Sequence, residues 1–209
     1  MLEHEQKAWH AGFIRVAGMD EAGRGPLAGP VVAGAVYIAQ EFLSAEQDGV
    51  LAGLTDSKKL TVFQRNVFLS LFRDREEILF ASGSASVNEI DRINILKATH
   101  LAMRRAVEAL PMQPDHLLVD GLPVNGLPVS STALVKGDAS SLLIAAASVV
   151  AKVERDRVME KLARAFPDYG WGRNKGYGTP EHLAALREHG PCKHHRHSFA
   201  PVRQLSFDF

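Results

Sequence analysis

Four acidic residues end or follow short apolar runs of this sequence. Asp20 and Glu21 close the first such run, Asp120 closes LLVD, and Asp138 closes ALVKGD before two serines. Taken singly, each is more often a solvated turn residue or a helix cap. Brought together, four carboxylates would raise one another's pKa values unless hard cations neutralised them. As a set they therefore predict a site for Mg²⁺ or Mn²⁺, ions that prefer oxygen ligands.

Asp20 and Glu21 are neighbours on one predicted strand, and successive strand side chains point to opposite faces. They can serve one site only if the strand bulges or finishes between them. The glycines of the following turn, GRG at 23–25, permit either arrangement.

Short apolar segments rich in β-branched residues position these acids. The predicted strands cover 13–19, 31–38, 116–119 and 132–135. A capping box formed by Ser86 and Glu89 starts a long amphipathic helix that ends at Pro111. Ser140 or Ser141 caps another helix, whose start at 142–151 should be buried and whose charged continuation should be solvated.

The remaining C-terminal part is predicted as a Gly/Pro-rich loop over 170–180 followed by a short helix over 180–189. Because strands and helices alternate, the pattern favours an α/β domain with a C-terminal helical extension.

Length and composition indicate one domain of 209 residues, of which 46% are hydrophobic. The first ten residues are polar and charged, and the apolar run at 142–151 is far shorter than the ~20 residues of a membrane span. The single cysteine, Cys192, cannot form an internal disulfide. We therefore expect a soluble, cytoplasmic protein with no membrane association.

The formal net charge is zero, so the total charge gives no indication of a nucleic-acid partner. Its distribution is uneven, because residues 152–209 hold eleven Lys and Arg against seven Asp and Glu, with five histidines. A phosphate backbone would prefer this C-terminal end.

Six stretches resemble the type 2 ribonucleases H, and specifically bacterial ribonuclease HII. They are GMDEAGRGPLAGPV at 18–31, TDSKKL at 55–60, LLVDG at 117–121, KGDASSLLIAAASVVAKVERDR at 136–157, NKGYGTPEH at 174–182 and HSFAPV at 197–202. They span almost the whole chain in the family's order. The resemblance implies the ribonuclease H-like fold: a mixed five-stranded sheet flanked by helices, with a core at about 13–165 and an extension at about 166–209.

The resemblance also implies a role for each acid. Asp20, Glu21, Asp120 and Asp138 would bind two divalent ions, Mn²⁺ or Mg²⁺, for an in-line displacement at phosphorus. The substrates would be RNA–DNA hybrids and duplex DNA with embedded ribonucleotides, cut to leave 3′-hydroxyl and 5′-phosphate ends. The enzyme would act as a monomer in ribonucleotide and primer removal.

Substrate-binding residues follow from the same motifs. In the family, Gly23, Arg24 and Gly25 correspond to the motif whose backbone contacts the ribose 2′-hydroxyl, and glycine lets the main chain approach closely. Tyr177 matches the tyrosine that packs on the next deoxyribose. The basic residues near these motifs are candidates for phosphate contacts: Lys58, Lys59, Lys136, Lys152, Arg155, Arg173 and Lys175.

Other interpretations fit the residues less well. The glycines at 23–29 lack dinucleotide-loop spacing, and Cys192 with His194, His195 and His197 lacks the spaced pairs of a closed zinc site. A hybrid-binding module without catalysis would not need four crowded acids. Ribonuclease HIII carries a further N-terminal domain, for which the dozen residues before the first strand leave no room.

The last six residues, Gln204 to Phe209, look like the short peptides that dock on bacterial sliding clamps. A glutamine, a leucine and two aromatic residues could fill an apolar pocket on such a partner. The alternative is that Phe207 and Phe209 fold back onto the domain.

Overall fold

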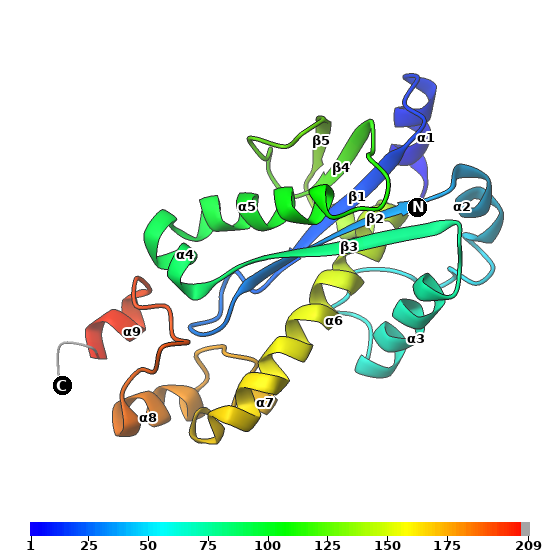
Figure 1. The fold of residues 1–209 in the computed structure, drawn as a ribbon. Helices are drawn as coiled ribbons and strands as arrows, with labels where there is room; N and C mark the ends of the chain where they lie inside the picture. Colours follow the sequence, from blue (N-terminus) through cyan, green and yellow to red (C-terminus); the bar gives the residue numbers. More distant parts are fainter. Residues whose placement is uncertain (206–209) are drawn as a thin grey trace.

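Five strands form one mixed sheet in the order β3-β2-β1-β4-β5 in the computed structural model, which describes residues 1–205 (Figure 1). The strands are β1 (Val16–Ala22), β2 (Val31–Ile38), β3 (Ile78–Ala85), β4 (His116–Asp120) and β5 (Ser130–Leu134). β2 is antiparallel to β1 and β3, whereas β4 is parallel to β1 and β5. The carboxyl ends of β1, β3, β4 and β5 therefore meet at one end of the sheet.

Two helices cover the two faces of the sheet. α6 (Leu142–Ala165) packs against β1 and β2 on one face, and α5 (Ile95–Glu108) packs against β2 and β3 on the other. Glycines in the strands let α6 lie close. A Cβ on Gly18 would stand 2.2 Å from a Leu143 backbone carbon, and one on Gly34 would stand 2.4 Å from the Ala147 carbonyl oxygen. Larger residues there would push the helix off the sheet.

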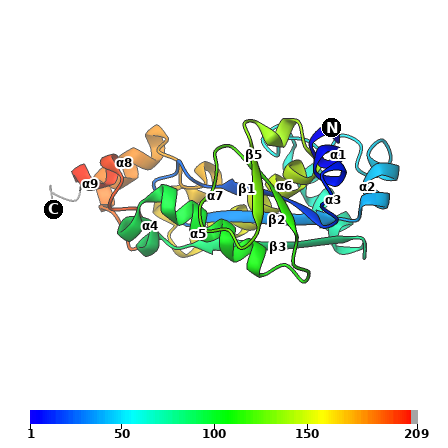
Figure 2. The ribbon, with the colours of Figure 1, turned by 90° about the horizontal axis from the view of Figure 1, so that it is seen from above.

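The other elements lie around this sandwich. The helices are α1 (Glu3–His10), α2 (Gln40–Glu46), α3 (Val62–Arg73), α4 (Val87–Ile93), α7 (Trp171–Asn174), α8 (Pro180–His189) and α9 (Ala200–Leu205), with 3₁₀ turns η1 (Gly137–Ala139) and η2 (Pro167–Tyr169). In Figure 2, α8 and α9 lie at one end of the molecule and α1 and α2 at the other. Within residues 1–205, none of the helices is long and apolar enough to cross a membrane.

The C-terminal extension has its own small apolar cluster. Met159, Trp171 and Leu186 are buried in it, together with Leu27 and Ala28 from the segment after β1. The extension is thereby packed onto the segment that follows the acidic pair.

The predicted fold class is confirmed: a five-stranded mixed sheet flanked by helices, with a C-terminal helical extension. The strand over 31–38, the helix over 180–189 and the Ser141 cap are confirmed as well. The sequence analysis did not predict strand β3 or the helices α1, α2 and α3.

Three sequence-based boundaries and one burial prediction were wrong. The predicted 13–19 strand is Val16–Ala22, so the acidic pair lies within it. The long helix after Ser86 is broken at Asn94, whose φ of 70° ends α4 and whose side chain caps α5. Residues 171–174 of the predicted loop form the short helix α7. The charged end of α6 is partly buried, since Arg155 is only 1% exposed.

Candidate active site

Three aspartates converge at the carboxyl end of the sheet. One oxygen each of Asp20, Asp120 and Asp138 lies within 4.8 Å of the other two. Asp20 and Asp120 come from the neighbouring parallel strands β1 and β4, and Asp138 lies in η1, directly before α6. The Gly137 N–H donates to Asp120 Oδ1 at 2.7 Å, which ties η1 to the end of β4. The fold therefore gathers acids that are about 100 residues apart in the sequence.

Burial and mutual repulsion raise the pKa values of two of these carboxyl groups, those of Asp20 and Asp138. Burial is the main cause of the well-raised pKa of Asp20, and the charges of Glu21 and Asp120 add to it. The pKa of Asp138 is raised by burial and then by the charge of Asp120. A nearby cation would relieve both effects.

Glu21 lies beside the three aspartates but outside their group. β1 pairs with β2 in unbroken register through Asp20, Glu21 and Ala22, so the expected bulge or strand end between the acids is absent. Glu21 Oε1 instead lies 3.3 Å from Arg24 Nη1. Burial raises the pKa of Glu21, Arg24 lowers it, and the charge of Asp120 raises it again. Its carboxylate is thus within electrostatic reach of the site.

Lys58 faces the acids from the loop that precedes α3. Burial lowers its pKa, but the charges of Asp56 and of the three aspartates outweigh burial and raise it. Arg65 of α3 holds this loop by donating to the carbonyl oxygens of Ser57 and Leu60 at 2.8 and 2.6 Å. Lys58 therefore lies on a loop whose backbone Arg65 holds in place.

The Gly-Arg-Gly turn and Tyr177 are neighbours. A Cβ on Gly25 would lie 3.6 Å from the Tyr177 ring, an ordinary contact, and the ring is 48% exposed. Gly23 is constrained, because its φ is 97° and a Cβ there would stand 2.0 Å from Arg155 Nε. The predicted ribose-contacting turn and the predicted sugar-packing ring thus share one surface.

Two buried arginines, whose structural role the sequence analysis did not predict, hold this turn from beneath. Arg196, which is 0% exposed, donates to the carbonyl oxygens of Gly23, Arg24 and Gly29 at 2.6 to 3.0 Å. Arg155 donates to the carbonyl oxygens of Pro30, Ala28 and Lys175. Burial, and then the charge of Arg155, lower the pKa of Arg196 to about 9, so it stays charged at neutral pH.

A signal for one of these arginines exists in the sequence. Ala151, Arg155 and Met159 follow one another at four-residue spacing, which places Arg155 on the buried side of the helix. Arg155 is therefore unavailable for the phosphate contact that the sequence suggested. Arg196 lies outside any periodic segment, and no sequence pattern identifies its partners.

A buried histidine pair fixes the backbone of Tyr177. Cys192 N–H donates to His195 Nδ1 at 3.0 Å, which leaves His195 Nε2 to donate to His182 Nε2. Trp171 Nε1–H also donates to His182 Nε2, so His182 Nδ1–H donates to the Tyr177 carbonyl oxygen at 2.9 Å. These are neutral tautomers, consistent with pKa values that burial lowers, to about 3 for His195.

The other basic residues predicted for phosphate contact fall into two groups. Lys59 and Lys136 are exposed near Lys58 and Asp138 in the chain. Three of the remaining cations already have acidic partners: Lys152 pairs with Asp156 at 2.5 Å, Lys175 with Glu160 at 3.1 Å, and Arg173 with Glu181.

The donor set fits divalent metal ions that prefer oxygen. Asp20, Asp120 and Asp138 offer only carboxylate oxygens, and residues 1–205 supply no soft ligand to this group. The raised pKa of the buried Asp20 points the same way, since uncompensated negative charge is costly there.

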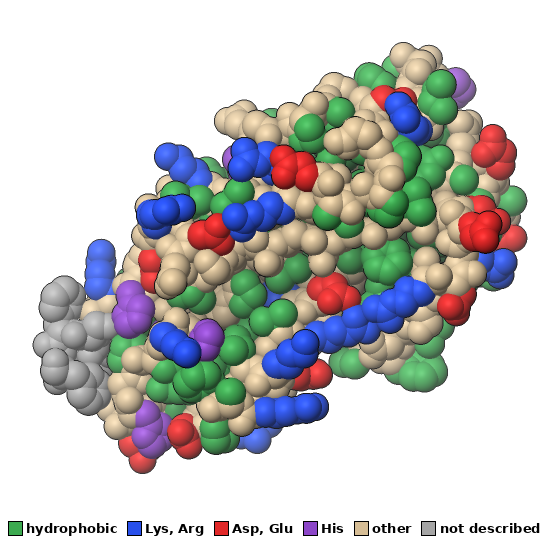
Figure 3. Space-filling model, in the orientation of Figure 1, with side chains coloured by type: hydrophobic (Ala, Val, Ile, Leu, Met, Phe, Trp, Pro, Cys, Tyr) green, Lys and Arg blue, Asp and Glu red, His purple; other side chains and the backbone are tan. Residues whose placement is uncertain are grey.

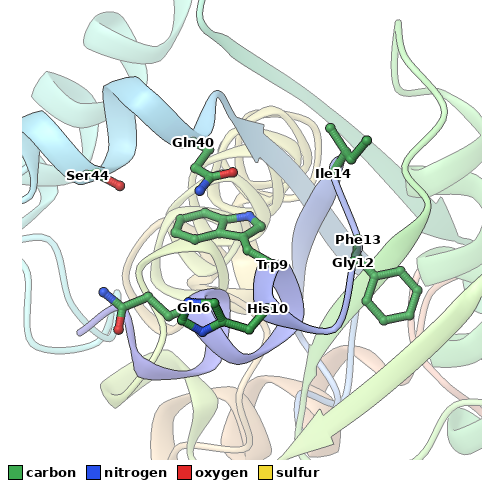
Figure 4. Close-up of a pocket in the computed structure, with 8 residues that line it drawn as sticks. All are labelled: Gln6, Trp9, His10, Gly12, Phe13, Ile14, Gln40 and Ser44. Carbon is green, nitrogen blue, oxygen red and sulfur yellow. The ribbon is translucent and has the colours of Figure 1, made fainter.

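The protein also has a pocket that lies far from the acidic site. A pocket of about 550 Å³ is lined by residues of α1, α2 and the segment before β1, with the Trp9 ring standing beside Gln40 (Figure 4). It lies at the amino end of β1, and none of the described residues that line it is Asp or Glu. It therefore takes no part in the acidic site.

Comparison with known proteins agrees with this geometry. The family profile described as Ribonuclease HII matches residues 17–202. A Ribonuclease HII of Desulfitobacterium hafniense is 48% identical over 98% of this chain and 75% of the relative. The ribonuclease H2 structure from Pyrococcus horikoshii OT3 superposes with a TM-score of 0.77 at 28% identity, over 93% of this chain and 98% of that one.

A further similar structure is that of the PCNA:RNase HII complex from Archaeoglobus fulgidus. Its TM-score is 0.69 at 27% identity, over 87% of this chain and 93% of that chain. The profile match, the near full-length identity and the shared fold agree with one another. The chain belongs to the ribonuclease HII family and is a ribonuclease H.

Proposed function

We propose that this enzyme hydrolyses the RNA strand of RNA–DNA hybrids and nicks duplex DNA on the 5′ side of embedded ribonucleotides. The observation that carries the proposal is the convergence of Asp20, Asp120 and Asp138 within 4.8 Å at the sheet end from which the Gly-Arg-Gly turn departs. Carboxylates that can bind metal ions, beside a turn whose backbone can contact a ribose, suit the hydrolysis of a phosphodiester bond at a ribonucleotide.

The three aspartates, with Glu21 beside them, would hold Mn²⁺ or Mg²⁺. When bound, two such ions supply an activated water and stabilise the leaving 3′ oxygen. The chain's own groups do the rest: the backbone of residues 23–25 contacts the 2′-hydroxyl, and Tyr177 packs on the following deoxyribose. Lys58 balances negative charge beside the acids. The products carry 3′-hydroxyl and 5′-phosphate ends.

The test uses a DNA duplex with one ribonucleotide, incubated with Mg²⁺, Mn²⁺ or a chelator, and the cut is mapped. We expect one cut on the 5′ side of the ribonucleotide, abolished by the chelator. Cleavage that ignores the ribonucleotide, or that persists with the chelator, would contradict the proposal.

Replacing Asp138 tests the acid site directly. Asp138→Asn should abolish cleavage and leave hybrid binding largely intact, because a neutral amide binds a hard cation poorly. The matched control is Asp168→Asn, the same change on a residue outside the site. Cleavage by Asp138→Asn within a few-fold of the unmodified enzyme would contradict the two-metal assignment.

The chain end provides a second partner proposal, a sliding clamp bound through Gln204 to Phe209. The Archaeoglobus fulgidus relative forms a PCNA:RNase HII complex, which supports a partner of this kind. In this chain α9 ends at Leu205, and Ser206 to Phe209 lie outside the described residues. The test is a calorimetric titration of sliding clamp with the full chain and with a variant truncated after Arg203. Equal binding by both, or binding by neither, would remove the idea.

We further propose that residues 1–209 act as one domain and as a monomer in the cytoplasm, in ribonucleotide and primer removal. Packing of the extension onto Leu27 and Ala28 supports the single domain. Light scattering of the purified chain would test the monomer.

A further inference from the structure

Two exposed cations that have no ion-pair partner among residues 1–205 lie away from the basic C-terminal end of the chain. Six of the eleven cations of that end are engaged, since Lys152, Arg157, Arg173 and Lys175 are in ion pairs and Arg155 and Arg196 are buried against carbonyl oxygens. Arg92 at the end of α4 and Lys97 in the first turn of α5 are both exposed. Neither makes an ion pair with any residue between Met1 and Leu205.

These two residues line a groove of about 640 Å³ between α4–α5 and the loop over 121–129 that follows Asp120. The other charged or titratable lining residues are Glu89, His100, Arg104 and Arg105. Arg105 pairs with Glu89 at 2.7 Å, and Arg104 is 3.8 Å from Glu108. Lys and Arg side chains gather over α4 and α5 in Figure 3. With four cations and one carboxylate, the lining has an excess of positive charge.

The groove lies at the same end of the sheet as the proposed active site. α4 begins directly after β3, at the sheet end that carries the acids, and the 121–129 loop leaves from Asp120 itself. The pKa of His100 in the groove is lowered by burial and then by the charge of Arg24. The Arg24 guanidinium group of the Gly-Arg-Gly turn is therefore close enough to His100 to lower its pKa.

We propose that this groove binds the sugar–phosphate backbone of the substrate duplex, at phosphates away from the cleaved linkage. Arg92 and Lys97 supply the contacts, because exposed unpaired cations bind phosphate without first breaking an ion pair. The groove fixes the position of the duplex and reads no sequence. This inference rests on the proposed function, since it assigns a second contact region to the same substrate.

The test is the double variant Arg92→Gln with Lys97→Gln. Binding to a duplex with one ribonucleotide is followed by fluorescence anisotropy with a chelator present, over a series of salt concentrations, and KM and kcat are measured separately with Mg²⁺. The matched control is Lys7→Gln with Arg15→Gln, which removes the same charge at the opposite end of the sheet.

Loss of two phosphate contacts should lower the slope of log Kd against log salt by about two. KM should rise by about tenfold with kcat nearly unchanged, whereas the control should match the unmodified enzyme. An unchanged slope, or a loss confined to kcat, would overturn the groove assignment. Failure of the unmodified enzyme to cut the duplex would instead overturn the proposed function, so the two failures are distinguishable.

Discussion

Asp20 and Glu21 have different electrostatic environments. Asp20 is 7% exposed and has the strongly raised pKa, whereas Glu21 is relieved by Arg24. Alternation along β1 separates these neighbours, because consecutive side chains point to opposite faces. One strand thus contributes Asp20 to the three-aspartate group and Glu21 beside that group, where Arg24 offsets its charge.

At the same scale, Tyr177 is the residue through which we expect selection of a ribose-to-deoxyribose junction. Tyr177→Ala should lower kcat/KM on single-ribonucleotide duplexes by about tenfold to a hundredfold, since packing of one aromatic ring on a nucleotide is worth about 1–3 kcal/mol. The measurement compares that substrate with a long RNA–DNA hybrid, on which the loss should be smaller.

Tyr177→Phe is the control, because it keeps the ring and loses only the hydroxyl group. It should stay within a few-fold of the unmodified enzyme. Since the side chain is half exposed, neither variant should alter the free energy of unfolding much. Equal activity of the alanine variant on both substrates would refute the role of the ring.

At the scale of elements, strand ends deliver the acids and the C-terminal segment positions the turn beside them. The segment that carries Arg196 pairs with the chain at Ala28 through a bridge to His195, and Arg196 then reaches the carbonyl oxygens of the turn. An arginine suits this role because its planar fork offers several donors at once. The extension is thus a structural support of the active site.

Replacing Arg196 should therefore damage both stability and activity. Arg196→Met leaves carbonyl oxygens of Gly23, Arg24 and Gly29 without partners, at a cost of about 3 kcal/mol in the free energy of unfolding. Cleavage of the single-ribonucleotide duplex should fall further than the fraction of unfolded protein explains. Urea denaturation and kinetics at one temperature measure the two effects.

The control for this variant is Tyr169→Phe in the same extension. It removes the hydrogen bond from Tyr169 Oη to the Gly190 carbonyl oxygen, which touches no residue of the turn. It should cost about 1 kcal/mol and leave cleavage intact. If both variants lost cleavage in proportion to their stability, Arg196 would have no specific effect on the turn.

At the scale of the whole molecule, buried neutral histidines tie stability to pH. His182 and His195 have pKa values below the ordinary value of 6.5, to about 3 for His195. Below pH 6.5 the unfolded chain binds protons that the folded chain does not, so stability rises with pH in this range. The contribution of His195 is complete above pH 6.5 and is lost as the pH falls towards about 3.

The expected outcome is a decline in the free energy of unfolding between pH 6.5 and 4.5 of at most about 1.4 kcal/mol per pH unit for each such histidine. His195→Gln, which does not titrate, should show a shallower decline. The check is urea denaturation of both proteins at pH 4.5, 5.5, 6.5 and 7.5. Parallel pH profiles would contradict the assignment.

Much of the fold and the acidic site could be predicted because the signals are local. An apolar strand that ends in an acid, as at 117–120, needs only its own residues to be recognised, and so does the Ser141 cap before an apolar run. The Gly-Arg-Gly turn and the motif that contains Tyr177 are local as well. Parallel strands then bring such acids to one sheet end whatever lies between them.

Only the tertiary structure decided which charges remain available. Arg155 and Arg196 are buried against carbonyl oxygens up to 173 residues away, and Lys175 pairs with Glu160, whereas Arg92 and Lys97 remain unpaired within residues 1–205. Lysine and arginine look alike in a sequence whether they are solvated, paired or buried. Their state depends on partners that lie far along the chain, and local patterns hold no information about such contacts.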